Sequence, residues 1–92
     1  MEREKLLMTD QEFDLLDELY FVQPYDYLKE ELAWSDEELY QTLVGLHQKG
    51  WLKCYNKMDE EVYETNVDLK TNYQSYFYLA SKKGLMAHNG RA

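Results

Sequence analysis

The sequence predicts a single α+β domain, in which a helical first half is followed by antiparallel strands. Between residues 9 and 50, apolar residues recur at helical spacing, and two sequence patterns there are typical of helix starts. From Trp51 onward, apolar and polar residues alternate, as in a strand. With 92 residues, of which 45% are hydrophobic and 15% aromatic, the chain is large enough for one modest core and too small for two.

A first helix is expected over about residues 10–20, because Thr9 and Glu12 have the spacing of a capping box. Its buried stripe is predicted to consist of Phe13, Leu15, Leu16, Leu19 and Tyr20. Residues 1–8 are interpreted as an N-terminal arm whose apolar side chains either pack on the first helix, with Met8 against Phe13, or meet another subunit. These side chains are Leu6, Leu7 and Met8.

A second, short helix is expected over about residues 25–33, and a third begins after Ser35 with almost no linker. Ser35 and Glu38 repeat the capping-box pattern, and Gly50 supplies the left-handed residue that commonly closes a helix. The apolar stripe of this third helix is Leu39, Leu43 and Leu46. Gly45 lies inside the helix at a cost of about 1 kcal/mol relative to alanine, which predicts close packing against a neighbour.

The second half of the chain predicts a β-hairpin. Residues 51–57 alternate between apolar and polar, and residues 73–80 are expected to return as a strand after a polar connection over residues 59–72. The side chains predicted to point inward are Leu52, Cys54, Phe77 and Leu79. The opposite side would then carry aromatic rings typical of protein interfaces, namely Trp51, Tyr55, Tyr76 and Tyr78. A short helical turn over residues 82–87 and a loose tail over residues 88–92 follow.

Two segments resemble parts of bacterial winged-helix regulators. LHQKGWL, residues 46–52, is similar to their junction between third helix and wing, and YLASKKGL, residues 78–85, is similar to their exit from the wing. Residues 9–87 therefore resemble the winged helix-turn-helix superfamily that includes the MarR-like and PadR-like transcription regulators. The resemblance implies a winged-helix fold: a three-helix helix-turn-helix core, a β-hairpin wing and a short C-terminal helix.

In that family the third helix enters the DNA major groove and the wing reaches the flanking backbone. The resemblance thus implies DNA-facing residues on the third helix, which are Ser35, Asp36, Glu37, Tyr40, Gln41, Val44 and Gln48. The candidates for phosphate contacts are Lys29 on the second helix, Lys53 and Lys57 on the following strand, and Lys82 and Lys83 after the return strand.

The charge pattern opposes DNA binding. The net charge is −8, and residues 1–50 contain 13 Asp or Glu against 4 Lys or Arg. Residues 36–38 are three carboxylates at the helix end that would enter the groove, and each like charge about 4 Å from a phosphate costs roughly 1 kcal/mol in water. We therefore expect a regulatory module that acts mainly through protein contacts, as a homodimer or with another protein. Sequence-specific duplex DNA binding is the alternative.

No residue pattern predicts catalysis, a cofactor or a metal site. The glycines form no phosphate-binding loop, Cys54 has no second cysteine, and His47 is expected to be a packed helix residue. We expect a thiol that is buried or half-buried and no enzymatic activity. No apolar run reaches the about 18 residues that cross a bilayer, and the N-terminus lacks a signal-peptide pattern, so a cytoplasmic location without membrane contact is expected.

Overall fold

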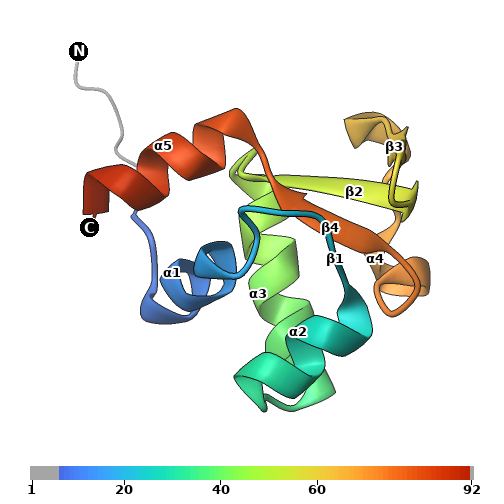
Figure 1. Ribbon diagram of the computed structural model, residues 1–92, viewed down its shortest axis with the longest axis horizontal. Helices are drawn as coiled ribbons and strands as arrows, with labels where there is room; N and C mark the ends of the chain where they lie inside the picture. The colour runs from blue at the N-terminus through green and yellow to red at the C-terminus, as the bar shows by residue number, and fades with distance from the viewer. Residues whose placement is uncertain (1–6, 92) are drawn as a thin grey trace.

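The computed structural model describes residues 7–91, which form an α+β arrangement of helices around one antiparallel sheet (Figure 1). The α-helices are α1 (Asp10–Asp17), α2 (Tyr25–Leu32), α3 (Asp36–Gln48), α4 (Leu69–Asn72) and α5 (Lys82–Arg91). The strands are β1 (Gln23–Pro24), β2 (Leu52–Lys57), β3 (Glu60–Val62) and β4 (Phe77–Ala80), with a 3₁₀ turn at Glu64–Asn66. Within these residues, no helix is both long enough and apolar enough to cross a membrane.

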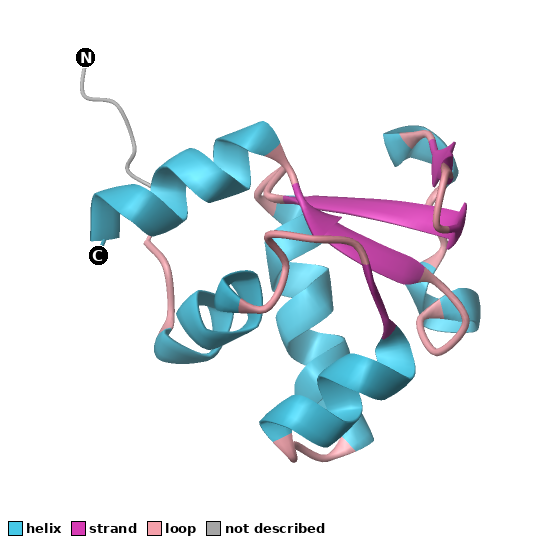
Figure 2. Cartoon of the chain, in the orientation of Figure 1, coloured by secondary structure: helices cyan, strands magenta, loops and turns pink. Residues whose placement is uncertain are grey.

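The sheet has the strand order β1–β4–β2–β3, so the last strand in the sequence lies at its centre (Figure 2). Pro24 pairs with Phe77 on one side of β4, and Tyr78 pairs with Cys54 on the other. A register irregularity between Tyr55 and Lys57 precedes the turn into β3. In the view of Figure 1, α1 lies to the left of α3, and the two helices are in contact.

The ends of the helices follow the signals in the sequence. Thr9 accepts a hydrogen bond from the Glu12 N–H, and the Glu12 carboxylate accepts one from the Thr9 N–H, both at 3.0 Å, which confirms the first capping box. Ser35 caps α3 by accepting from the Glu38 N–H at 3.1 Å. Gly50 has a φ of 76°, as predicted for the residue that closes the third helix.

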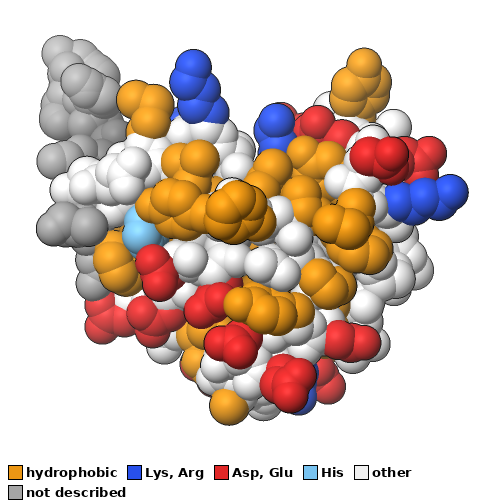
Figure 3. All heavy atoms as spheres, in the orientation of Figure 1, with side chains coloured by type: hydrophobic (Ala, Val, Ile, Leu, Met, Phe, Trp, Pro, Cys, Tyr) orange, Lys and Arg blue, Asp and Glu red, His pale blue; other side chains and the backbone are white. Residues whose placement is uncertain are grey.

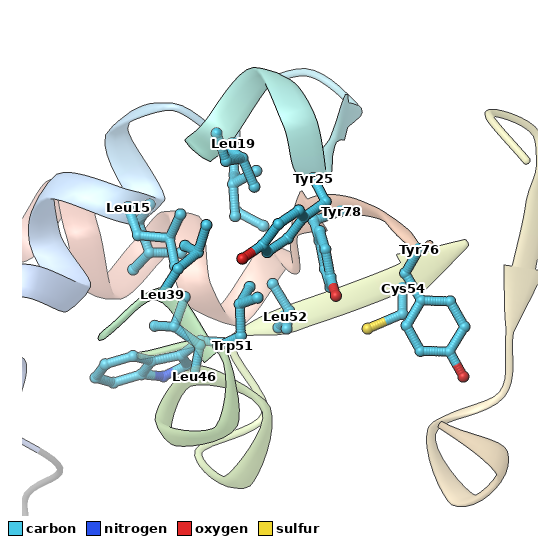
Figure 4. Packing of buried hydrophobic residues seen from close by; sticks show 14 of the residues in the cluster. Leu15, Leu19, Tyr25, Leu39, Leu46, Trp51, Leu52, Cys54, Tyr76 and Tyr78 are labelled. Atoms are coloured by element: carbon cyan, nitrogen blue, oxygen red, sulfur yellow. The ribbon is translucent and has the colours of Figure 1, made fainter. Parts of the chain in front are cut away.

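The core lies between the helices and the inner face of the sheet (Figure 4). Its fully buried side chains include Tyr78, Leu15, Leu16, Leu19, Leu28, Leu39, Leu43, Leu46 and Cys54. In the first helix, Phe13 is only half-buried and Tyr20 is 39% exposed, so the predicted stripe is too wide. The helix ends at Asp17, before Tyr20 completes another turn.

The side-chain orientation of β4 is opposite to the prediction. Tyr76, Tyr78 and Ala80 face the core, while Phe77 and Leu79 are half-buried on the outer face of the sheet. The inner position suits the two tyrosines because both hydroxyls have backbone partners: the Tyr78 hydroxyl donates to the Tyr73 carbonyl, and the Tyr76 oxygen accepts from the Asp68 N–H. Asp68 belongs to the connection that was expected to be a polar loop, and Tyr73 was expected to begin the return strand.

The predicted hairpin connection and the C-terminal tail are more ordered than expected. The return strand begins at Phe77 rather than at residue 73, and α4 occupies part of the connection. The helix α5 continues through residues 88–91, where a loose tail was predicted. His88 is buried because its ring stacks on Phe13 at 4.2 Å and its Nδ1 shares a hydrogen bond with the Tyr20 hydroxyl at 2.8 Å. The domain therefore extends beyond residue 87.

The close packing predicted at Gly45 is confirmed. A Cβ at this position would lie 2.6 Å from Oε2 of Glu12, whose carboxylate is buried between α1 and α3. Oε1 of Glu12 also accepts a hydrogen bond from the Lys49 ammonium at 2.7 Å. The same ammonium donates to the Leu7 carbonyl at 2.6 Å, so one charged group joins the start of the described chain to α1 and α3.

Candidate nucleic-acid and protein interfaces

The solvent-facing side of α3 is formed by a line of polar residues. Ser35, Gln41 and Gln48 are exposed and Val44 is half-buried. The Gln41 amide donates to the Glu37 carboxylate at 3.0 Å, so its donor group is directed to a neighbouring acid on the same helix. The structure thus presents most of the predicted DNA-facing residues of α3 to solvent, with a carboxylate among them.

Tyr40 is half-buried, like Val44, and packs against another part of the fold. Its ring lies 4.8 Å from the ring of Tyr73, which follows α4. Tyr73 also packs edge-on against Tyr25 at 5.4 Å. The segment between β3 and β4 therefore folds back onto α3, and Tyr40 stabilises that contact.

The N-terminal end of α3 is negatively charged, and one of its carboxylates interacts with residues of α2. Asp36 accepts a hydrogen bond from the Tyr25 hydroxyl at 2.5 Å and lies 3.8 Å from the Lys29 ammonium. Burial and the Asp36 carboxylate together raise the pKa of Tyr25 above its usual range. Glu37 is exposed beside Asp36. These carboxylates occupy the place where a helix N-terminus would otherwise attract a phosphate.

The lysines near α3 are divided between its two ends, with Lys29 beside its start and Lys49 and Lys83 at its end. Three of them pair with acids on separate elements: Lys29 with Asp36, Lys49 with Glu12, and Lys53 with Glu61 at 3.9 Å. Lys53 alternates with the inward-facing Leu52 and Cys54, so it lies on the opposite face of the sheet from these two residues. Lys57 is exposed near the hairpin turn. In the view of Figure 3, the Lys and Arg side chains lie singly near the edges of the molecule.

The predicted aromatic interface is largely internal. Trp51, Tyr76 and Tyr78 are 3%, 4% and 0% exposed, so they belong to the core and not to a surface. Of that group, Tyr55 alone is half-buried on the outer face. In the predicted N-terminal arm, Leu7 is 77% exposed, Met8 is half-buried against the core, and Leu6 lies outside the described residues.

Another apolar surface, which the sequence did not indicate, takes the place of the predicted one. Phe77 and Leu79 join Tyr55 on the outer face of the sheet, and Phe21, beside β1, is 77% exposed. The signal for Phe21 in the sequence was its place after the end of a helix and shortly before Pro24, where a chain is extended. We define the outer-sheet face as Pro24, Tyr55, Phe77 and Leu79.

A cavity of about 150 Å³ lies between the end of α3 and the β2–β3 hairpin. His47, Cys54, Glu61 and Val62 are among its lining residues. Nε2 of His47 is buried and has no hydrogen-bond partner among residues 7–91. Within the same residues, no group of three His, Cys, Asp or Glu side chains is placed to hold a metal ion.

The Cys54 thiol is buried, as expected, and we predict that it is unreactive in the folded state. Burial, assisted by the nearby Glu61 charge, raises its pKa from 9.0 to about 12. At pH 8 this shift lowers the thiolate fraction about 1,000-fold, so alkylation by iodoacetamide should be slow until urea unfolds the chain. Mass spectrometry of the alkylated fraction across a urea titration measures this, and equal rates with and without urea would contradict it.

The same shift fixes the direction of a pH effect on stability. Between pH 9 and about 12 the unfolded thiol releases its proton while the folded thiol keeps it, so the free energy of unfolding falls as the pH rises through this window. The pKa of Tyr78 is also raised, mainly by burial, which acts in the same direction.

Comparison of the chain with protein-family models, with curated proteins and with solved structures gave no match.

Proposed function

We propose that the protein is a winged-helix regulatory module, of the kind found in transcription regulators, that acts through protein contacts and has no catalytic role. The strand order supports the winged-helix part of this proposal. A short strand between the first two helices pairs with the strand that returns from the hairpin, and α2 and α3 are adjacent in the chain. The helix α4, inserted between β3 and β4, is a departure from the simplest form of that fold.

The observation that carries the functional part is the charge on α3. Asp36, Glu37 and Glu38 lie in its first turn, where the helix would meet DNA, and Lys29 beside this turn is paired with Asp36. Binding to a duplex depends largely on cations that neutralise phosphates. A surface without such cations favours contact with another protein over contact with a polyanion.

A duplex titration tests this proposal. At low ionic strength, a fluorescent duplex of mixed sequence should bind the wild-type protein more weakly than about 10⁻⁴ M, the weak end of non-specific affinities. Salt-sensitive binding in the micromolar range would overturn the proposal, provided that Gln41→Ala weakens it. Gln11→Ala, at an exposed position of α1, is the matched control because it removes the same side chain away from α3.

A further inference from the structure

A polar groove of about 270 Å³ lies between the start of α1 and the first half of α3. Glu12, Glu38, Gln41 and Thr42 are among its lining residues. The last three share one face of α3, because residues three and four apart are neighbours on a helix. The groove is smaller than the about 300–1,000 Å³ of pockets that hold small molecules, so its size suits a single side chain.

On the α3 wall, the side chains offer hydrogen-bond acceptors to an occupant. The Gln41 amide nitrogen is turned to the Glu37 carboxylate at 3.0 Å, so the amide oxygen is the group left to bind an occupant. The Thr42 hydroxyl donates its one proton to the Glu38 carbonyl at 2.8 Å, so it can only accept a further hydrogen bond. The Glu38 carboxylate, an acceptor on both oxygens when ionised, has no hydrogen bond or ion pair with another side chain among residues 7–91.

On the α1 wall, Glu12 supplies a further acceptor in a fixed position. Its side chain is only 6% exposed, and its Oε1 accepts hydrogen bonds from the Thr9 N–H and the Lys49 ammonium. Its Oε2 accepts no hydrogen bond from the described part of the chain and is not sealed from solvent. A donor that enters the groove can therefore reach a carboxylate oxygen that burial holds in place.

The charge around the groove favours a cation. Within their bounds, α1 contains four Asp or Glu and α3 contains three, and neither helix contains Lys or Arg. Lys49, just after α3, is paired with Glu12 and leaves the Glu38 charge unbalanced. An excess of one sign along a cleft raises the local concentration of the opposite charge.

We propose that this groove binds an arginine side chain of a protein partner. A guanidinium has five N–H donors in a plane and no acceptor, so it can donate to acceptors on both walls at once. A lysine ammonium is a more strongly hydrated point charge and lacks this fork of donors. The inference rests on the proposed function, because it names the chemistry of the protein partner proposed there.

A nuclear magnetic resonance titration of the isotope-labelled chain with N-acetyl-L-arginine amide tests the proposal. The backbone amide signals of Glu12, Glu38, Gln41 and Thr42 should shift and saturate, with a Kd in about the millimolar range for one side chain. N-acetyl-L-citrulline amide has nearly the same shape but is neutral and carries an acceptor oxygen, so it should bind at least about tenfold more weakly. No saturable shift of these signals up to about 20 mM, or equal binding of the two compounds, would overturn the proposal.

Two variants separate the groove from the general charge of the chain. Glu38→Gln keeps the size of the side chain and the backbone N–H that Ser35 caps, and it should weaken arginine binding at least about fivefold. Glu30→Gln is the matched control, because Glu30 is exposed on α2, outside the groove, and loses the same charge. The control should keep the wild-type Kd within about twofold. Equal effects of the two variants would mean that net charge attracts the arginine, and would overturn the proposal.

These outcomes are independent of the duplex titration. A chain that binds neither the arginine derivative nor DNA contradicts the groove and leaves the proposed function standing. Micromolar duplex binding that depends on Gln41 contradicts the proposed function, whatever the arginine derivative does.

Discussion

Replacing Tyr78 with alanine is expected to lower the free energy of unfolding by about 3–5 kcal/mol, the range for truncating a large buried aromatic residue. Tyr78 is fully buried at the centre of the sheet, between the β1 and β2 pairings of β4. Its hydroxyl also donates to the Tyr73 carbonyl at 2.5 Å, and this carbonyl would lose its partner. Since small domains are stable by about 5–15 kcal/mol, the variant should be close to unfolded at 37 °C.

Urea denaturation followed by circular dichroism measures this effect. Tyr63→Ala is the control, because Tyr63 is 78% exposed and its truncation should change stability by less than about 0.5 kcal/mol. Tyr78→Phe separates the two contributions, since it keeps the ring and should cost only about 1 kcal/mol through the lost hydrogen bond. Similar stabilities for the Tyr78→Ala and Tyr63→Ala proteins would show that Tyr78 does not lie in the core.

Gly84→Ala is expected to destabilise the fold by about 1–3 kcal/mol or more, although alanine is the better helix former. A Cβ on Gly84 would lie 2.4 Å from the Trp51 carbonyl oxygen and 3.0 Å from the Trp51 Cβ. The first of these atoms belongs to the backbone, so relief requires α5 to move away from the start of β2. That movement would also strain the hydrogen bond from the Ser81 hydroxyl to the Gly50 carbonyl at 2.7 Å.

Gly90→Ala supplies the comparison within the same helix. Apart from its chain neighbours and the backbone of α5, no atom of the described part of the chain lies within 4 Å of the Cβ that it would add, so this substitution should be neutral or stabilise the protein by up to about 1 kcal/mol. Thermal unfolding of the two variants beside the wild-type protein should give midpoint shifts of opposite sign or, at least, very different size. Equal shifts would mean that α5 does not pack on Trp51 as described.

The helical half of the fold was predictable because its signals are local. Thr9 with Glu12, Ser35 and Gly50 each act within one turn of a helix, and each is found in the predicted role. The orientation of β4 was not predictable in this way. Alternation alone allows either set of side chains to face inward. The tyrosines can face inward because their hydroxyls find hydrogen-bond partners in the backbone of Asp68 and Tyr73, outside β4, and these partners could not be foreseen from the pattern of the strand.

The candidate surfaces were predictable only in part, for the same reason. The exposed line on α3 follows from its apolar stripe, but the stacking of Tyr40 on Tyr73 depends on the unforeseen α4 segment. Because the side chains of β4 were predicted to face the wrong way, the predicted interface was also wrong: Trp51, Tyr76 and Tyr78 are core residues. Burial of His88 likewise depends on Phe13 and Tyr20, which are far from it in sequence.

The central position of the last strand has a consequence for biosynthesis. While the ribosome is still adding residues before Phe77, β1 has no strand to pair with, because its neighbour in the sheet is β4. At that stage the core leucines of the helices also lack Tyr78, which belongs to the same hydrophobic cluster in the folded protein. Such distant pairings slow folding, since a long loop must close before any contact rewards it. The nascent chain should thus remain open to chaperones and proteases until β4 has emerged.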